Sequence, residues 1–142
     1  MIIDNSLVLS DSQAITATAA STNVIDTGAN GTAYGHASAL ASDLGKLDGN
    51  GIQLAVNLTE AFNNLTSLKI ALEVSADNST FVEVASRTYL LAELTPVKQL
   101  DFPARVPVGA SRRYMRLNYT VTGTAPTTGK IFAAVVAGRQ SQ

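Results

Sequence analysis

The sequence predicts an all-β protein, an antiparallel β-sandwich or jelly roll with an extended N-terminal arm and a long glycine-rich loop. Three observations support this fold class. Apolar and polar residues alternate in several segments with the period of two that turns one face of a strand toward a core. About eight or nine such short segments are separated by turn signals, without a long helical pattern between them. Small residues dominate and tryptophan is absent, which suits closely packed short strands.

The N-terminal residues 1–22 are expected to form an extended arm or edge strands, and residues 23–142 a single jelly-roll domain. Leu7–Leu9 and Ala14–Ala20 are weak extended segments, and a turn-prone Ser-Asp-Ser sequence divides them. The second segment has small side chains that bury little apolar area. We therefore expect it to lie at a sheet edge or across another surface.

A glycine-rich segment follows a short strand that we expect at Asn23–Asp26. Residues 27–51 contain six glycines and one alanine-rich piece, Ala37–Leu44, which is expected to form a turn of helix. A loop of this length inside a compact domain is usually functional or disordered. We expect a functional loop that becomes ordered on contact with a partner.

Two segments have the clearest strand pattern, Ile52–Leu58 and Leu68–Val74. Their alternation predicts two core strands. The positions expected to point inward are Ile52, Leu54, Val56, Leu58, Leu68, Ile70, Leu72 and Val74.

Weaker signals complete the middle of the chain. Residues 76–80 are rich in side chains that bond their own backbone, which predicts a turn into a strand at Phe81–Ser86. Tyr89–Leu94 is expected to include a helical turn that Pro96 ends. A further extended piece is expected at Lys98–Phe102.

The C-terminal stretch from Arg112 to Gly138 is predicted to be a hairpin with a wide connection. In its first arm Met115, Leu117, Tyr119 and Val121 point to one face. The second arm, residues 130–137, is apolar on both faces, so it should run through the middle of a sheet or under a partner. Gly123 and Gly129 with a proline between them indicate a loop longer than a two-residue turn.

Composition excludes several classes of protein. The chain has no cysteine, which excludes a disulfide scaffold, a cysteine nucleophile and a thiolate zinc site. With 15% charged residues and a net charge of −1, it lacks the basic excess that nucleic-acid binding needs. The N-terminus has no positive region before its short apolar run, and no apolar stretch is long enough to span a bilayer. We expect synthesis in the cytoplasm and no membrane partner.

The sequence also lacks a convincing catalytic or cofactor motif. His36 is the single histidine, so a hydrolytic triad or a nitrogen-ligated metal site has no support, and a solvated loop residue is expected. Gly129 and Lys130 do not match a phosphate-binding loop in spacing or in the residue that follows. The oxygens of Asp77 and its neighbours could bind calcium, but a plain hairpin turn explains them more simply. We expect a protein without enzymatic activity or cofactor.

Basic residues concentrate before the C-terminal strand. Arg105, Arg112, Arg113 and Arg116 are four of the ten lysines and arginines. Arg112, Tyr114 and Arg116 share one strand face, and arginine and tyrosine are enriched in protein interface hot spots. The alternative is a solvated sheet face with surface ion pairs to Glu73 or Glu83, which contribute little. Both interpretations stay open at this point.

These residues lead to a resemblance that runs along nearly the whole chain. The sequence resembles the jelly-roll capsid cement (decoration) proteins of tailed bacteriophages. The segments that carry the likeness are residues 1–4 (MIID), 10–26 (SDSQAITATAASTNVID), 43–45 (DLG), 59–68 (TEAFNNLTSL) and 113–126 (RYMRLNYTVTGTAP).

The resemblance implies a non-enzymatic virion protein that binds the outer surface of an icosahedral shell. Its partners would be the major capsid protein and itself, as a homodimer, with a trimer as the alternative. We include Asp43 and Leu44, from one of the matching segments, with Arg112, Tyr114 and Arg116 in the expected interface. Residues 1–22 and the glycine-rich loop are expected to contact neighbouring subunits.

A discoidin-like carbohydrate-binding β-sandwich is the alternative function. Residues 75–81 and 113–117 also resemble the strand pattern of that class. Sugar-binding platforms usually expose stacking aromatic rings, however, and this chain has four tyrosines and four phenylalanines, most of them inside predicted strands.

Overall fold

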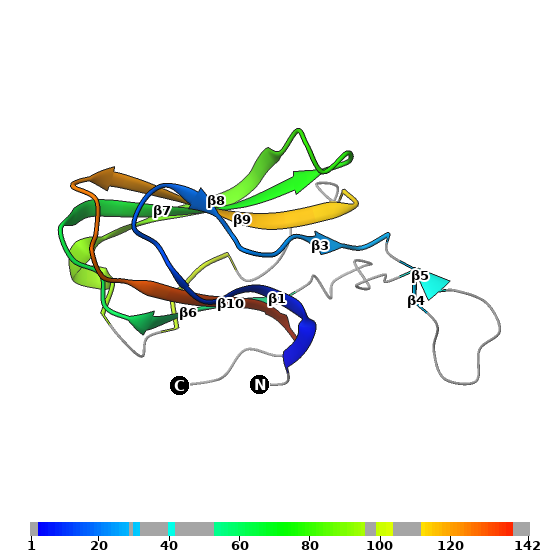
Figure 1. Cartoon of the computed structure of the whole chain (residues 1–142), viewed down its shortest axis with the longest axis horizontal. Helices are drawn as coiled ribbons and strands as arrows, with labels where there is room; N and C mark the ends of the chain where they lie inside the picture. The colour runs from blue at the N-terminus through cyan, green and yellow to red at the C-terminus, as the bar shows by residue number, and fades with distance from the viewer. Residues whose placement is uncertain are drawn as a thin grey trace.

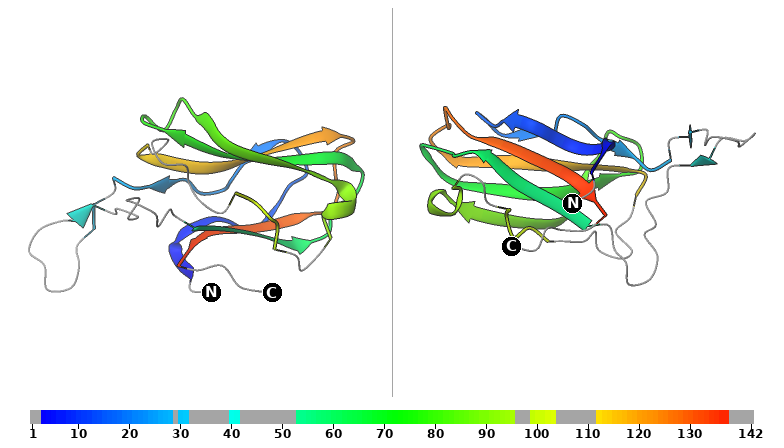
Figure 2. Two further views of the ribbon diagram at one scale, coloured as in Figure 1. Left: turned by 180° about the vertical axis from the view of Figure 1, so that it is seen from behind. Right: turned by 90° about the horizontal axis from the view of Figure 1, so that it is seen from below.

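Two antiparallel sheets packed face to face form the body of the protein (Figures 1 and 2). In the computed structural model, residues 3–28, 30–31, 40–41, 53–95, 99–103 and 112–137 are described. The smaller sheet has the order β1-β10-β6, formed by β1 (Ile3–Ala14), β10 (Lys130–Val136) and β6 (Gln53–Glu60). The predicted β-sandwich is confirmed.

The larger sheet has the order β2-β9-β7-β8, and β3 also pairs with β9. Its strands are β2 (Ala19–Ala20), β3 (Ile25–Asp26), β7 (Leu65–Ser75), β8 (Val82–Leu90) and β9 (Tyr114–Gly123). Two short strands, β4 (Asn30–Gly31) and β5 (Leu40–Ala41), pair with each other in a separate ribbon that stands apart from the sandwich in Figure 1. A 3-10 turn, η1 (Leu91–Glu93), follows β8.

The topology is that of a jelly roll, a long hairpin rolled into two sheets. The turn between β7 and β8 is the tip of this hairpin. Successive pairs of segments, one from each side of the turn, lie progressively farther from the tip along the chain. β6 lies beside the segment around Gln99, which forms a bridge to Asn57. Farther out, β9 pairs with β2 and β3, and β10 pairs with β1.

The core lies between the sheets, and the alternation seen in the sequence produces it. Every inward position predicted for the two central strands is buried where it is described; Ile52 lies outside the described residues. Met115, Leu117 and Tyr119 of β9 are buried as well, and Val121 is partly buried against them. The second face of β10 is also apolar, and Ala134 and Val136 pack there with Val8 and Ala55. β10 is the middle strand of its sheet, as its two apolar faces predict.

The predicted C-terminal hairpin is wrong. β9 and β10 belong to different sheets, and the loop between them crosses from one sheet to the other. The glycines at its ends take positive φ values of 92° at Gly123 and 132° at Gly129. Turn residues predict that the chain reverses, but they do not determine which sheet the next strand joins.

The N-terminal segment is an edge strand integrated into the body, which is one of the two alternatives that the sequence leaves open. The turn-prone residues 10–12 do not end the strand, because β1 continues through them with shifts in its register to β10. Leu9 and Ile15 are fully buried in the core. Ser10 Oγ and the buried Tyr119 hydroxyl share a hydrogen bond of 2.8 Å that joins the two sheets.

Three local expectations have mixed outcomes. The turn of helix expected in Ala37–Leu44 is contradicted at Leu40–Ala41, which form β5; the rest of that piece lies outside the described residues. The expected helical turn before Pro96 is present as η1. The extended piece expected at Lys98–Phe102 is reduced to the single bridge at Gln99, followed by a bond from Leu100 N to Val56 O of 2.8 Å.

Candidate interaction surface

The outer face of the larger sheet is polar, and its charged groups are paired with one another. Arg116 Nε lies 2.7 Å from Glu73 Oε2, and Asn118 Nδ2 donates to Glu73 Oε1 at 3.0 Å. The Arg116 guanidinium lies 3.6 Å from the centre of the Phe81 ring. This is the ion-pair alternative that the sequence leaves open, and it fixes Arg116 within its own chain.

Lys69 and Glu83 form a second pair on this face, with 2.7 Å between Nζ and Oε2. The ammonium group of Lys69 lowers the pKa of Glu83. Both side chains are about two-fifths exposed, so solvent screens the pair and it contributes little to stability.

Arg113 forms a bidentate clamp with Asp26 at the point where the glycine-rich segment leaves the body. Arg113 Nε and Nη2 lie 2.7 and 2.9 Å from the two carboxylate oxygens of Asp26. Thr27 N and Thr27 Oγ1 both donate to Arg113 O at 2.9 Å, and Gly28 N donates to Asp26 Oδ1 at 2.9 Å. A Cβ at Gly28 would lie 2.8 Å from Arg113 Nε, so a side chain there would push against the clamp.

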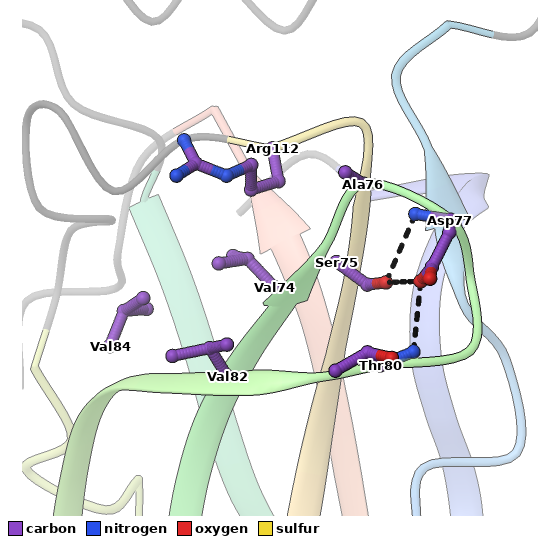
Figure 3. A pocket seen from close by; sticks show the side chains of 8 residues that line it. All are labelled: Val74, Ser75, Ala76, Asp77, Thr80, Val82, Val84 and Arg112. Carbon is purple, nitrogen blue, oxygen red and sulfur yellow. Dashed lines mark hydrogen bonds between the residues drawn. The ribbon is translucent and has the colours of Figure 1, made fainter.

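A pocket lies beside the turn between β7 and β8 (Figure 3). Its volume is about 280 Å³. It is lined by Val74, Ser75, Ala76, Asp77, Thr80, Val82, Val84 and Arg112. The pocket therefore combines an aliphatic floor, a polar turn and one arginine.

The polar side of the pocket is a turn closed by Asp77. Its carboxylate accepts from Ser79 N at 2.9 Å, from Thr80 N at 2.8 Å and from the Ser75 hydroxyl at 2.8 Å. The two backbone N–H groups and then the hydroxyl lower the pKa of Asp77 to about 2. Asn78 occupies the left-handed region with φ of 57°, which asparagine tolerates well. These bonds describe a side-chain-closed turn, as the sequence predicts.

Over the described residues, no group of three or more histidine, cysteine, aspartate or glutamate side chains is placed to hold a metal ion. No helix in the same residues is long and apolar enough to cross a membrane.

A family model, Bbp16, matches residues 9–136, which include the pocket and both sheets except residues 3–8 of β1. The chain belongs to the Bbp16 family. Membership in this phage-related family suggests a phage structural protein. A search of curated proteins finds no match.

The predicted interface residues of this Bbp16-family chain lie in different surroundings. Arg112 is exposed at the pocket, Tyr114 is half-buried with the Arg113 guanidinium 5.0 Å from its ring centre, and Arg116 is bound to Glu73. Asp43 and Leu44 lie outside the described residues, as do His36 and Arg105. The interface role of the five predicted residues stays a prediction.

Val82 and Val84 of the pocket and the Arg113 clamp were not predicted from the sequence. Val82 occupies an alternating strand segment, where it is indistinguishable from a core residue without knowledge of what covers the strand end. Arg113 lies within the basic cluster, and its partner Asp26 is 87 positions away. Only the pairing of β3 with β9 brings these two residues together.

Proposed function

We propose that the protein is a structural virion protein that binds the outer surface of an icosahedral phage capsid and stabilises contacts between major capsid protein subunits. Membership in the Bbp16 family over residues 9–136 is the observation that carries this proposal. The proposal includes assembly with the major capsid protein and self-association as a homodimer, with synthesis in the host cytoplasm.

The physical character of the body supports this role. A rigid sandwich can stabilise a shell through shallow contacts that the symmetry of the shell multiplies, without a single tight site. The outer face of the larger sheet has its charges internally paired, as at Glu73 with Arg116 and at Glu83 with Lys69. Paired charges of this kind keep the outer face of the larger sheet hydrated.

The carbohydrate-binding alternative receives no support from the aromatic residues. Among the described residues, no aromatic ring is exposed. Phe62, Tyr89, Phe102 and Tyr119 are buried, and Phe81, Tyr114 and Phe132 are half-buried. The Phe81 face is covered by the Arg116 guanidinium, so it cannot stack on a sugar without first displacing that group.

Co-sedimentation tests the proposed function. Shells assembled from the major capsid protein of the same phage, without this protein, are mixed with the purified chain and pelleted. We expect saturable binding at a stoichiometry set by the shell symmetry, and shells that withstand a higher temperature once decorated. A chain that stays in the supernatant at every concentration, with no change in shell stability, contradicts the proposal.

A further inference from the structure

The pocket beside the Asp77 turn leaves apolar surface uncovered at the end of the larger sheet. Val82 is 61% exposed, and Val84 and the buried Val74 lie beside it (Figure 3). Val82 is the most exposed large hydrophobic residue that the structure describes. Single exposed apolar residues are ordinary on protein surfaces, but this one lies in a concave site with two further valines.

The pocket has polar groups at the Asp77 turn and at its rim. Ser75, Asp77 and Thr80 use their hydrogen bonds to close the turn, as the dashed lines in Figure 3 show. The Asp77 carboxylate faces these donors, and their hydrogen bonds stabilise its negative charge. Arg112 is exposed at the rim and brings a positive charge to the entrance. A ligand that enters therefore meets aliphatic groups below and a guanidinium above.

The size of the pocket decides what class of ligand it can take. Pockets for drug-sized molecules usually measure roughly 300–1,000 Å³ and enclose most of the ligand. The volume of this pocket, about 280 Å³, lies just below that range, and an exposed valine forms one of its sides. It has room for one protein side chain, and an anchor side chain in a pocket is the usual hot spot of a protein interface.

We propose that this pocket receives one aliphatic side chain of the major capsid protein, with a neighbouring carboxylate of the same segment bound by Arg112. The inference rests on the proposed function and deepens it, because it names the surface and the chemistry of the contact. The valines supply the apolar burial. The guanidinium binds a carboxylate in a planar, two-bonded geometry that a lysine cannot reproduce.

Two residues of the same strand provide a matched experiment. Val82 is 61% exposed and lies in the pocket, whereas Leu90 is 60% exposed and lies at the other end of β8, outside it. They are eight positions apart along the strand, a distance of roughly 26 Å. The variants Val82→Asp and Leu90→Asp thus place the same charge at equally exposed apolar positions of one strand.

Affinity for shells that lack the protein is measured by co-sedimentation, and thermal unfolding is recorded for each variant. We expect Val82→Asp to weaken binding at least about tenfold, the loss for one apolar side chain left without its contact. Leu90→Asp should bind like the wild type. Arg112→Glu should weaken binding, and Arg112→Lys should restore only part of it. Val82→Asn serves if the aspartate variant unfolds.

The outcomes distinguish a failure of the pocket inference from a failure of the proposed function. If the wild type binds shells and Val82→Asp binds equally well, the pocket inference is wrong and the proposed function stands. If the wild type itself does not bind, the proposed function fails. A Val82→Asp variant that loses self-association and keeps its shell affinity would identify the occupant as a second copy, which also overturns the inference.

Discussion

Gly129 lies against the ring of Phe62 in the loop that crosses between the sheets. Its φ of 132° is a conformation that other residues rarely adopt, and a Cβ there would overlap the Phe62 ring. Both effects oppose any side chain at this position.

We expect Gly129→Ala to lower the free energy of unfolding by more than about 1 kcal/mol. For a domain of this size, that corresponds to a fall in Tm of roughly 3 °C or more. Thermal unfolding measures it, with Thr124→Ala as the control because Thr124 is an exposed residue of the same loop. An alanine variant as stable as the wild type would show that the crossing does not depend on this glycine.

Asp77 gives a prediction about pH. Its pKa is lowered in the folded protein to about 2, whereas an aspartate in an unfolded chain titrates near 3.9. A lowered folded-state pKa stabilises the protein above the unfolded value, and this stabilisation is lost as pH falls through the folded value.

Asp77→Asn should therefore be less stable than the wild type at pH 5, and the difference should shrink as pH falls from about 4 to about 2. Denaturant unfolding at several pH values measures this, with Asp11→Asn, an exposed change on β1, as the control. A difference between wild type and Asp77→Asn that stays constant over this range would contradict the role given to the carboxylate.

The sequence predicts single residues well where a local pattern controls them. Alternation identified the buried positions of β6, β7 and β9, and the bonding side chains identified the Asp77 turn. The pairing of Arg116 with Glu73 was one of two alternatives, because a strand pattern says which face a residue is on and not which strand lies beside it. The register of β7 with β9 brings Glu73 opposite Arg116. The contact of Arg116 with the Phe81 ring could not be predicted, because no local sequence pattern reports it.

At the scale of elements, β1 is part of the domain rather than a detachable arm. Leu9 contributes a fully buried side chain to the core, Ser10 bonds to Tyr119 of β9, and Gln13 donates to Ala20 O in the segment that follows the strand. Removal of residues 1–22 would uncover β10 and part of the core, so we expect the remaining chain not to fold.

We expect Leu9→Ala to lower the free energy of unfolding by about 2–5 kcal/mol, the range for large-to-small changes in a core. Asp11→Ala, two residues along the same strand and exposed, should change it by less than about 0.5 kcal/mol. Denaturant unfolding distinguishes the two. Equal effects at the two positions would mean that β1 lies on the surface as an arm.

The Arg113 clamp controls how the glycine-rich segment leaves the sandwich. Arg113 is half exposed and Asp26 is partly exposed, so the ion pair itself adds little stability. Its effect is local, because Gly28 N donates to the same carboxylate oxygen that Arg113 Nε binds.

Arg113→Ala should speed amide hydrogen exchange at Gly28 while leaving Tm nearly unchanged, because local opening is then easier than global unfolding. The neighbouring change Arg112→Ala is the matched control and should leave exchange at Gly28 as in the wild type. If Arg113→Ala also leaves it unaltered, the clamp does not hold the exit of this segment.

The pairing of strands is the part of this fold that is hardest to predict from the sequence. The stretch from Arg112 to Gly138 has the alternation, glycines and proline of a hairpin, but its two strands join different sheets. Pairing in a jelly roll is set by contacts between segments far apart in the chain, such as β1 with β10, and no local signal reports them. The pocket was missed for the same reason, since its walls come from β7, β8 and the residue before β9.

For the whole molecule, the described sheet edges are poorly suited to pairing with another chain. β1 has several register shifts against β10, and β8 has one against β7. The third long edge, β6, is met by Gln99 and Leu100. Irregular or covered edges discourage strand addition. Association is then expected through side-chain surfaces such as the pocket, and pairing with a neighbour's sheet edge is not favoured.

A reconstruction of the phage particle at a resolution that separates the strands tests the central claim most directly. The account predicts density for this sandwich on the outside of the shell at symmetry-related positions, with the Asp77 turn and Val82 against the major capsid protein. Particles that carry no such density, in a preparation that also lacks the polypeptide by mass spectrometry, would contradict it.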